Sequence, residues 1–370
     1  MRILFAGGGT AGHISPALAI ADAVKEKYSD AKLLFVGREG GDENKAVMNE
    51  EYELKTLKVE GFKRSLTPKN VKVLMHLLRS VKKARSILKE FKPQVIVATG
   101  GYVSLPVLLA GFTLKIPTVL HESNAYPGLV TRRLGKRCTR VILGVEAAKR
   151  HLKYEKNVTV IGNPVRAKFT ATDKQEARLK LGIKKNETLI VSFGGSGGAE
   201  RINEVICEVM EEYSTRNNSV KHVHGAGKRN YQKLKYAYPD LCRGKNGAKI
   251  IPYIDNMPEL LSAADISITR SGAMTLAELS CVDCIPILIP SPNVAANHQY
   301  YNAKAMEEKK GAVVIEEENL RTQTLISILK EQCEKVKNKK TVNQRGGFEN
   351  QHACRKEILK ELENCISRPF

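Results

Sequence analysis

The sequence of 370 residues lacks or is poor in several features that would identify its class. It has no tryptophan and 6% aromatic residues, and no apolar run reaches the roughly 18 positions that a membrane-spanning helix requires. Its start lacks the charged and then apolar pattern of a secretory signal, so none is expected. Acidic residues are also scarce, and 39 Asp and Glu against 60 Lys and Arg give a net charge of +21.

This charge favours an anionic partner, which can be a nucleic acid, an acidic membrane surface or a phosphorylated substrate. Few aromatic residues are available to stack on bases, and the sequence carries no nucleic-acid-binding motif. We therefore expect no nucleic-acid partner, and a non-enzymatic nucleic-acid-binding protein is only a remote alternative.

Metal-ligating patterns are equally scarce. Only Cys281 and Cys284 among the eight cysteines form a C-x-x-C pair, and no second pair lies nearby. A buried structural role is favoured over zinc or redox chemistry for this pair. No D-x-D or His/Asp cluster with metal spacing follows a predicted strand, so we expect chemistry without a metal or a cofactor.

Short apolar runs alternate with amphipathic stretches along both halves of the sequence. Continuous Val, Ile and Leu runs separated by helical patterns, such as the one over 16–28, indicate parallel sheets covered on both faces. Strands are predicted over 2–7, 32–37, 93–100, 116–122, 140–145 and 158–162, and then over 188–193, 249–254, 264–272, 285–291 and 311–316.

The strand pattern stops at Gly162–Pro164 and then restarts. This predicts two Rossmann-like, doubly wound α/β domains, over 1–163 and 164–345, that face a cleft. A helix is predicted within 346–370 and is expected to brace the N-terminal domain. Ligands bind such sheets outside the carboxyl ends of the strands, where the glycine-rich turns fall.

The first such turn contains Gly7, Gly9 and Gly12, which match the G-x-G-x-x-G fingerprint, followed by His13. A dinucleotide interpretation needs an acidic residue after the second strand, and Glu39 lies later than the usual spacing. A phosphate or another anion is the alternative. The helix dipole disfavours a charged imidazole, so His13 is either a proton acceptor or a packed, capping histidine.

Polar residues follow two further strands in the first half. Gly100 and Gly101 allow a close backbone approach before the hydroxyl of Tyr102. His121, Glu122 and Asn124 form either a polar wall of the site or an internally satisfied network.

The second half repeats the strand–turn–helix plan. Ser196 lies in a glycine turn, FGGSGGA, that lacks the lysine of a Walker A loop. Gly272 begins another turn, and a helix predicted to start near Thr275 carries Glu278, whose two oxygens can accept two ribose hydroxyls. Amide side chains over 296–303 suit sugar hydroxyls.

Seven motifs agree in identity and order with one family. GGGTAGH, GGYVS, HESN, GNPVR, GGSGGA, GAMTLAE and HQYYNA resemble the MurG family of bacterial N-acetylglucosamine (GlcNAc) transferases of peptidoglycan synthesis, over residues 1 to about 310. The resemblance implies the two-domain GT-B architecture. It also implies a hexosyltransferase that moves GlcNAc from UDP-GlcNAc to the C4 hydroxyl of undecaprenyl-pyrophosphoryl-MurNAc-pentapeptide (lipid I), with inversion, to give lipid II and UDP.

The resemblance implies His13 and Glu278 as catalytic residues and Gly100, Gly101 and Tyr102 on the acceptor side. Arg166 and Ser196 would contact the donor phosphates, Ile254 the uracil and Gln299 the sugar. The implied donor-binding residues are Thr10, Ala11, Gly12, Asn124, Arg166, Ser196, Ile254, Ala273, Met274, Thr275, Leu276, Ala277, Glu278 and Gln299. Ala11 departs from the family, which usually has glycine there.

A lipid acceptor requires contact with a membrane. Residues 62–92 hold ten Lys and Arg against one Glu, with an apolar stripe at Val71, Leu74, Leu78 and Val81. Either the helix packs this stripe on the core, or its start, with Phe62 and Leu66, enters the anionic cytoplasmic face of the cell membrane as a peripheral contact. A related enzyme acting on another lipid, such as diacylglycerol, is the alternative function.

Overall fold

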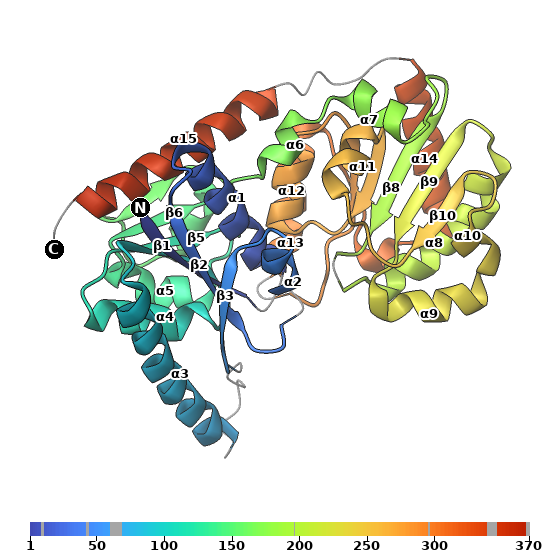
Figure 1. Cartoon of the computed structure of the whole chain (residues 1–370). Helices are drawn as coiled ribbons and strands as arrows, with labels where there is room; N and C mark the ends of the chain where they lie inside the picture. The colour runs from blue at the N-terminus through green and yellow to red at the C-terminus, as the bar shows by residue number, and fades with distance from the viewer. Residues whose placement is uncertain are drawn as a thin grey trace. The chain divides into compact units, whose positions relative to one another are not determined.

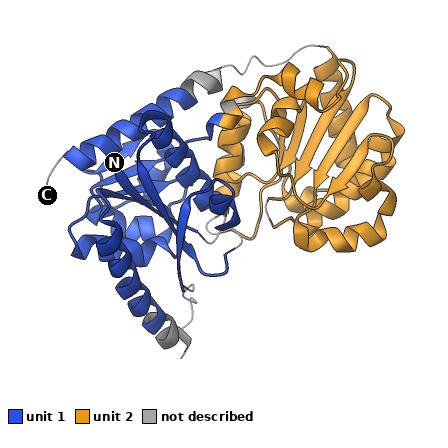
Figure 2. Ribbon diagram, in the orientation of Figure 1, with its two compact units in different colours: residues 1–167, 350–370 blue, residues 168–349 orange. Residues whose placement is uncertain are grey.

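The computed structural model describes residues 1–8, 11–41, 44–59, 69–195, 197–294, 297–338 and 346–367. They form two compact units, residues 1–167 with 350–370 and residues 168–349 (Figure 2). Each unit has one sheet in which every pairing between strands is parallel (Figure 1). The prediction of two parallel-sheet α/β domains is therefore confirmed.

Unit 1 has a seven-stranded sheet in the order β3-β2-β1-β4-β5-β6-β7. Its strands are β1 (Arg2–Gly7), β2 (Lys32–Arg38), β3 (Glu53–Leu57), β4 (Val95–Gly100), β5 (Thr118–Glu122), β6 (Arg140–Leu143) and β7 (Val158–Val160). Its helices are α1 (Ala11–Lys27), α2 (Asn44–Met48), α3 (Lys69–Phe91), α4 (Ser104–Thr113), α5 (Leu129–Leu134), η1 (Gly135–Arg137), η2 (Glu146–His151) and most of α15 (Gly346–Ser367). The strand order reverses between β1 and β4, which makes their carboxyl ends the expected ligand edge.

Alternate residues of β1 show how the sheet is covered. Ile3 and Phe5 pack with α1 and α15 on one face, whereas Leu4 and Ala6 pack with α3 and α4 on the other. All four side chains are fully buried. The continuous apolar run of the sequence follows from this burial on both faces.

Helix α15 belongs to unit 1 through its apolar stripe. Cys354, Ile358, Leu362 and Cys365 recur at helical spacing and join the cluster that covers α1 and β1. The side-chain amide of Gln351 accepts a hydrogen bond from the backbone N–H of Val165 (3.0 Å) and donates one to the carbonyl of Asn163 (3.1 Å). Thus α15 fastens the segment in which unit 1 ends.

Unit 2 has a six-stranded sheet in the order β10-β9-β8-β11-β12-β13. The strands are β8 (Thr188–Phe193), β9 (Val220–Gly225), β10 (Ala248–Ile251), β11 (Ile266–Thr269), β12 (Ile285–Leu288) and β13 (Val313–Val314). The helices are α6 (Ala167–Ala171), α7 (Lys174–Lys180), α8 (Glu200–Glu212), η3 (Ser214–Arg216), α9 (Lys228–Ala237), α10 (Pro239–Arg243), α11 (Met257–Ala263), α12 (Ala273–Leu279), α13 (His298–Lys310), η5 (Glu317–Asn319) and α14 (Thr322–Lys337). Here the order reverses between β8 and β11.

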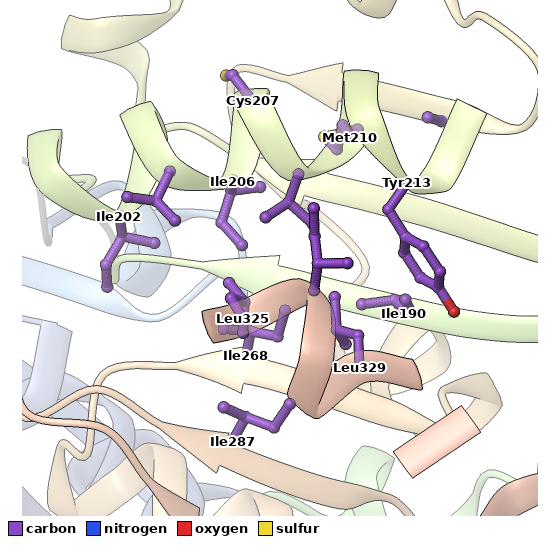
Figure 3. Packing of buried hydrophobic residues seen from close by; sticks show 14 of the residues in the cluster. Ile190, Ile202, Ile206, Cys207, Met210, Tyr213, Ile268, Ile287, Leu325 and Leu329 are labelled. Atoms are coloured by element: carbon purple, nitrogen blue, oxygen red, sulfur yellow. The ribbon is translucent and has the colours of Figure 1, made fainter. Parts of the chain in front are cut away.

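The core of unit 2 lies between its sheet and the helices α8 and α14. Figure 3 shows Ile206 of α8 and Leu325 and Leu329 of α14 directed toward the sheet residues Ile190 and Ile268. Each of these five side chains is fully buried. This packing fixes α8 directly after the glycine turn that precedes it.

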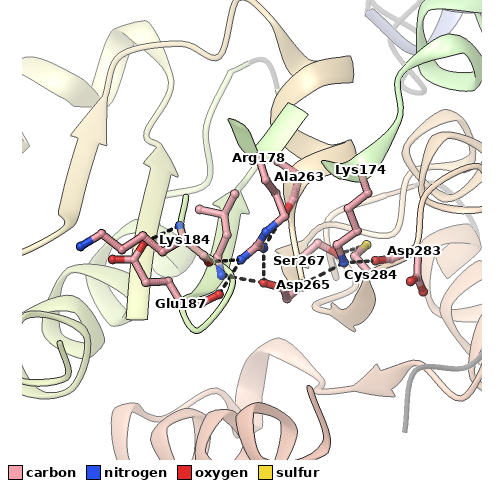
Figure 4. Close-up of polar contacts among 10 residues, drawn as sticks. Lys174, Arg178, Lys184, Glu187, Ala263, Asp265, Ser267, Asp283 and Cys284 are labelled. Atoms are coloured by element: carbon pink, nitrogen blue, oxygen red, sulfur yellow. Dashed lines mark hydrogen bonds and ion pairs between the residues drawn. The ribbon is translucent and has the colours of Figure 1, made fainter. Parts of the chain in front are cut away.

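The opposite, amino-terminal end of this sheet is held by charge. Asp265, which is 9% exposed, accepts hydrogen bonds from Arg178 Nη1 (2.7 Å) and the backbone N–H of Leu189 (2.9 Å), and Lys174 Nζ lies 3.0 Å from its other oxygen (Figure 4). Arg178 also donates to the carbonyls of Lys184 and Glu187. The network joins α7 to the starts of β8 and β11, away from the ligand edge.

Candidate active site

The first glycine turn of unit 1 joins β1 to α1. The helix begins at Ala11, not at residue 16 as predicted, because Pro16 is accommodated inside it. His13 therefore lies in the first turn, where backbone N–H groups point out of the helix end. Thr10 lies outside the described residues, and Gly12 is exposed.

The imidazole of His13 has a defined protonation pattern. Its Nδ1 lies 3.2 Å from the carbonyl oxygen of Gly8. A carbonyl can only accept, so Nδ1 carries the hydrogen and Nε2 carries the lone pair of the neutral ring. The adjoining helix terminus disfavours the imidazolium. His13 is thereby prepared to accept a proton at Nε2.

The glycine turn after β4 is built around this ring. A Cβ on Gly100 would lie 2.6 Å from His13 Cδ2, and a Cβ on Gly101 would overlap the carbonyl oxygen of Gly8. Both glycines have positive φ, +109° and +78°. Thr99 Oγ1 adds a hydrogen bond of 2.6 Å to the His13 carbonyl. The structure thus brings together His13, Gly100 and Gly101, while the neighbouring Tyr102 is half exposed.

The polar residues after β5 form a network. The buried Glu122 carboxylate accepts hydrogen bonds from the backbone N–H (3.0 Å) and Nδ2 (3.1 Å) of Asn124, from the Gly128 N–H (2.7 Å) and from Thr131 Oγ1 (2.7 Å). His121 is fully buried, and its Nε2 lies 3.1 Å from the Gly162 carbonyl. Of the two interpretations, an internally satisfied network describes His121 and Glu122. Its effect is to fix the side chain of Asn124.

Arg166 has carboxylate partners within unit 1. Its Nε donates to Asp22 of α1 (2.8 Å) and its Nη1 to Glu50 (2.7 Å), and the side chain is 19% exposed. The expected contact of Arg166 with a donor phosphate would compete with these ion pairs. In the structure, Arg166 anchors the GNPVR segment to α1.

The glycine turn of unit 2, which follows β8, packs against the loop that follows β9. Gly195 and Gly198 have positive φ, and a Cβ on Gly198 would overlap the Ala226 carbonyl oxygen. A Cβ on Gly227 would lie 2.7 Å from the Gly197 carbonyl oxygen. Backbone thus packs on backbone here, and α8 begins two residues after Gly198. Ser196 lies outside the described residues.

A pocket of about 540 Å³ opens beside this turn. Gly194, Gly198 and Gln299 line it, so the predicted phosphate turn and the predicted sugar residue share one surface. The Gln299 side chain is oriented by a hydrogen bond that its Oε1 accepts from the Ser291 N–H (2.9 Å). A neighbouring pocket of about 660 Å³ is lined by Asn297 and Tyr300 of the predicted 296–303 segment.

The pocket of about 540 Å³ also contains a residue that the sequence analysis missed. Arg270 follows β11 directly, pairs with Glu317 and donates to the carbonyls of Ile289 (3.3 Å) and Pro290 (3.2 Å). It is a fixed cation at the edge where the strand order reverses. The sequence analysis placed Arg270 inside a strand predicted over 264–272, whereas β11 ends at Thr269, so an arginine next to the Ser-Gly turn was the signal that could have found it.

Glu278 lies on α12, which begins at Ala273, two residues earlier than predicted. Met274 and Leu276 are buried, and the N-terminal end of α12 carries the positive end of the helix dipole. Burial raises the pKa of Glu278 to about 8. Ile254 is 6% exposed and packs on Gly225, so its side chain is largely covered.

No three His, Cys, Asp or Glu side chains in the described ranges lie where they could hold a metal ion. None of the helices that the structure describes is long and apolar enough to cross a membrane.

The sequence matches two family patterns and many full-length relatives. The glycosyltransferase family 28 N-terminal domain matches residues 3–143, and the family 28 C-terminal domain matches residues 189–361. A UDP-N-acetylglucosamine–N-acetylmuramyl-(pentapeptide) pyrophosphoryl-undecaprenol N-acetylglucosamine transferase of Acetivibrio thermocellus is 37% identical, over 97% of this chain and 99% of its own. The enzyme of the same name from Carboxydothermus hydrogenoformans is 44% identical, over 85% and 84%.

Solved structures share the fold. The chain superimposes on Acinetobacter baumannii MurG with a TM-score of 0.66 at 20% identity, covering 97% of this chain and 99% of that one. The glycosyltransferase of kitacinnamycin gives a TM-score of 0.70 at 14% identity, covering 98% of each chain. The chain belongs to the MurG family of glycosyltransferases, with the family 28 domains at both ends of a two-unit GT-B fold.

Proposed function

We propose that the protein transfers GlcNAc from UDP-GlcNAc to the C4 hydroxyl of the MurNAc residue of lipid I, with inversion and without a metal ion, to give lipid II and UDP. The identity of 37–44% with GlcNAc transferases over most of the chain carries this proposal. The two glycine turns, each at the ligand edge of its sheet, support it independently.

We assign donor binding to unit 2. The glycine turn with Ser196, the N-terminus of α12 and the cation of Arg270 are suited to the diphosphate. Glu278 would accept the two ribose hydroxyls, the backbone at Ile254 would contact the uracil, and Gln299 would bind the sugar. Residues Ala273 to Ala277 would border the diphosphate and the ribose, with the N–H groups that precede Leu276 nearest the phosphates, because the Leu276 N–H already donates to the Gly272 carbonyl (3.0 Å).

We assign the proton transfer to unit 1. His13 would take the proton of the C4 hydroxyl at Nε2 as the oxygen attacks the anomeric carbon, with UDP leaving from the opposite face. Gly100, Gly101 and Tyr102 would then line the acceptor side. The negative charge that develops on UDP would be stabilised by the N–H groups and by Arg270, which are fixed before the reaction.

Residues of unit 1 that touch the donor sugar complete the proposal. The backbone of Thr10, Ala11 and Gly12 would approach the sugar, and Asn124 is held in place for it by Glu122. Arg166 would reach a phosphate only by leaving Asp22 or Glu50.

We place the lipid acceptor at the cytoplasmic face of the membrane, reached through α3. Leu78 is 63% exposed and Met75 47% exposed, while Val81 packs on the core formed by Ala84 and Ile87. The predicted stripe is therefore core-facing only from Val81 onward. Phe62 and Leu66 lie outside the described residues, and the side chains of Val71 and Leu74 are not described. Basic residues near an anionic surface contribute about 1 kcal/mol each.

One assay tests the reaction and its acceptor. We expect UDP release from UDP-GlcNAc to require a lipid I analogue, and we expect diacylglycerol to be inactive in its place. Chromatography of the products would identify the transferred sugar. Transfer to diacylglycerol with no reaction on the lipid I analogue would overturn the assigned acceptor.

A vesicle assay tests the membrane contact. We expect more protein to sediment with vesicles that contain anionic lipid than with neutral vesicles, and the difference to shrink as salt screens the charge. Replacing Leu78 with Asp should weaken sedimentation, whereas replacing the exposed Leu179 of unit 2 with Asp should not. Binding that is indifferent to lipid charge would contradict the proposal.

A further inference from the structure

A line of polar side chains crosses the apolar core of unit 2. In order, it runs from Ser214 of η3 to His222 of β9, Ser192 of β8, His224 of β9 and Asn203 of α8, and it ends on the carbonyl of Ala226. Consecutive members lie 2.9, 2.9, 2.9, 3.1 and 3.0 Å apart. We call these five residues the buried polar chain, since none of their side chains is more than 2% exposed.

The carbonyl at its end gives the chain one direction. Asn203 Nδ2 donates to Ala226, so its Oδ1 accepts from His224 Nε2–H. His224 Nδ1 then accepts from the Ser192 hydroxyl, which in turn accepts from His222 Nε2–H. His222 Nδ1 finally accepts from Ser214. Every hydrogen has a partner only when both imidazoles are neutral and protonated at Nε2.

Burial agrees with this arrangement. It lowers the pKa of His222 to about 3 and that of His224 to about 4, so both rings are neutral near pH 7. Ser192 sits opposite His224 in the register of β8 and β9. Ile190 and Val220 lie in the same strands and are buried and apolar, so the loss of one member leaves the next member a buried polar group with a missing hydrogen bond. The chain therefore orients each member through the next.

The chain ends beneath the glycine turn. The Ala226 carbonyl that accepts from Asn203 is the atom that a Cβ on Gly198 would overlap. Asn230 Nδ2 lies 3.4 Å from this carbonyl and 3.4 Å from that of Gly197, which ties the two loops together. A shift of the Ala226 carbonyl would move the surface on which Gly197 and Gly198 rest.

We propose that Ser192, His222 and His224 are positioning residues for donor binding, which hold the Ala226 carbonyl and thereby the glycine turn in the conformation that receives the diphosphate. The inference rests on the proposed function, because that function places the donor diphosphate at this turn. None of the three side chains contacts the donor.

Ser192→Ala tests the inference, with Ser267→Ala as its matched control. Ser267 is also fully buried in this sheet, on the neighbouring strand β11, and its partner is the thiol of Cys284 (3.6 Å). Ser192→Ala should raise the KM for UDP-GlcNAc and the Kd for UDP about tenfold, as expected when buried groups lose their partner. Neither the acceptor KM nor the Ser267→Ala variant should change more than about twofold.

Two His224 variants keep the test decisive if Ser192→Ala folds poorly. The side-chain N–H of His224→Gln can still donate to Asn203, whereas His224→Leu cannot. Donor KM should therefore rise less in His224→Gln than in His224→Leu. Long-range proton–nitrogen spectra of the wild type should show both rings as Nε2–H, and Ser192→Ala should alter that pattern.

The outcomes separate the inference from the function on which it rests. A Ser192→Ala protein of lower stability whose donor KM and UDP affinity are unchanged would overturn the inference and leave the transferase intact. A wild-type protein that neither binds UDP nor releases it from UDP-GlcNAc would overturn both. Equal donor KM in the two His224 variants would also count against the inference.

Discussion

The two glycine turns follow the first strand of their sheets in the same way, yet they hold different things. In unit 1 the paired turns after β1 and β4 enclose a titratable ring, and Gly100 and Gly101 are required by His13 and by the backbone beside it. In unit 2 the paired turns after β8 and β9 meet mainly through backbone, with the side-chain amide of Asn230 between them, and Gly198 is required by the Ala226 carbonyl. One turn carries the His13 imidazole, and the other carries mainly backbone groups.

This difference shows how one supersecondary unit serves two purposes. A strand, a glycine turn and a helix N-terminus always provide N–H groups and a positive end. His13 in the first turn of α1 adds an imidazole that lies against the Gly8 carbonyl, whereas the second turn packs mainly on the backbone of the loop after β9. The residue that follows the glycines therefore determines which group the turn presents, and the glycines determine how closely the neighbouring loop can pack.

The largest effect should come from removing the base. We expect His13→Ala to lower kcat by roughly 10²-fold or more with little change in donor KM, because a general base acts on the transition state. Steady-state kinetics with both substrates varied would measure it. The exposed His352 of α15 offers the control, and His352→Ala should behave as the wild type. A His13→Ala enzyme of unchanged kcat would remove the contrast between the turns.

The next effect should come from filling the turns. Gly101→Ala should lower kcat, since it displaces the turn that supports the imidazole, and Gly198→Ala should raise donor KM. An alanine at positive φ is strained by about 1–2 kcal/mol before any overlap, so we expect changes of about tenfold. Measuring both parameters in both variants would show whether the turns divide the work.

Each of these glycine variants has a control with the same strain and no overlap. Gly40 in unit 1 and Gly182 in unit 2 both have φ of +67°, and a Cβ at either meets nothing within 4 Å. Gly40→Ala and Gly182→Ala should lose some stability and keep their kinetic parameters. If they lose activity as the turn variants do, general destabilisation explains the result.

A smaller effect should follow pH through Glu278. Burial raises its pKa from 4.5 to about 8, and two ribose hydroxyls would favour the ionised form. Donor binding should then release protons below pH 8, so donor Kd should fall as pH rises from 6 to 8, by at most about tenfold per unit. Titration calorimetry in buffers of different ionisation enthalpy would count the protons.

The same group gives a stability test with a definite sign. Between pH 4.5 and 8 the folded protein holds the Glu278 proton more tightly than the unfolded chain. The free energy of unfolding should therefore decrease as pH rises through this window. Glu278→Gln should lose both this slope and the pH dependence of donor Kd. An unchanged pH dependence in Glu278→Gln would assign it to another group.

The smallest effect on donor binding should come from the far end of the unit 2 sheet. Asp265→Asn weakens the buried pairing with Arg178 and Lys174 and should destabilise unit 2 by about 3–5 kcal/mol. Donor KM should stay within about twofold, because the network lies opposite the glycine turn. Urea unfolding and donor kinetics of the same preparation would compare the two. A large increase in KM would mean that the two ends of the sheet are coupled.

Much of the fold could be predicted because most strands are apolar on both faces. β1, β4 and β8 are continuous runs and were predicted, whereas β3 and β9 were missed. β3 is an edge strand with the polar sequence ELKTL and half-exposed alternate residues. β9 was missed because His222 and His224 make its sequence look polar. Both side chains are nevertheless buried in the core, where they form hydrogen bonds with Ser192 and Asn203.

The candidate site divides in the same way. His13 and the glycines of its turn could be predicted because strand, turn and helix are contiguous in sequence. The fit of Gly100 to the His13 ring could not, since it joins segments far apart in the chain. The carboxylate partners of Arg166 were equally out of reach, because Asp22 and Glu50 contact it only through the folded sheet.

The path of α15 has a consequence for synthesis of the protein on the ribosome. Unit 2 is continuous over residues 168–349, so it can fold as soon as that stretch has emerged. Unit 1 needs residues 350–370, and until they arrive the apolar surface beneath Ile358 and Leu362 stays uncovered. The unit whose synthesis starts first is therefore completed last. Gln351 can form its hydrogen bonds with Asn163 and Val165 only after residues 168–349 have been synthesised.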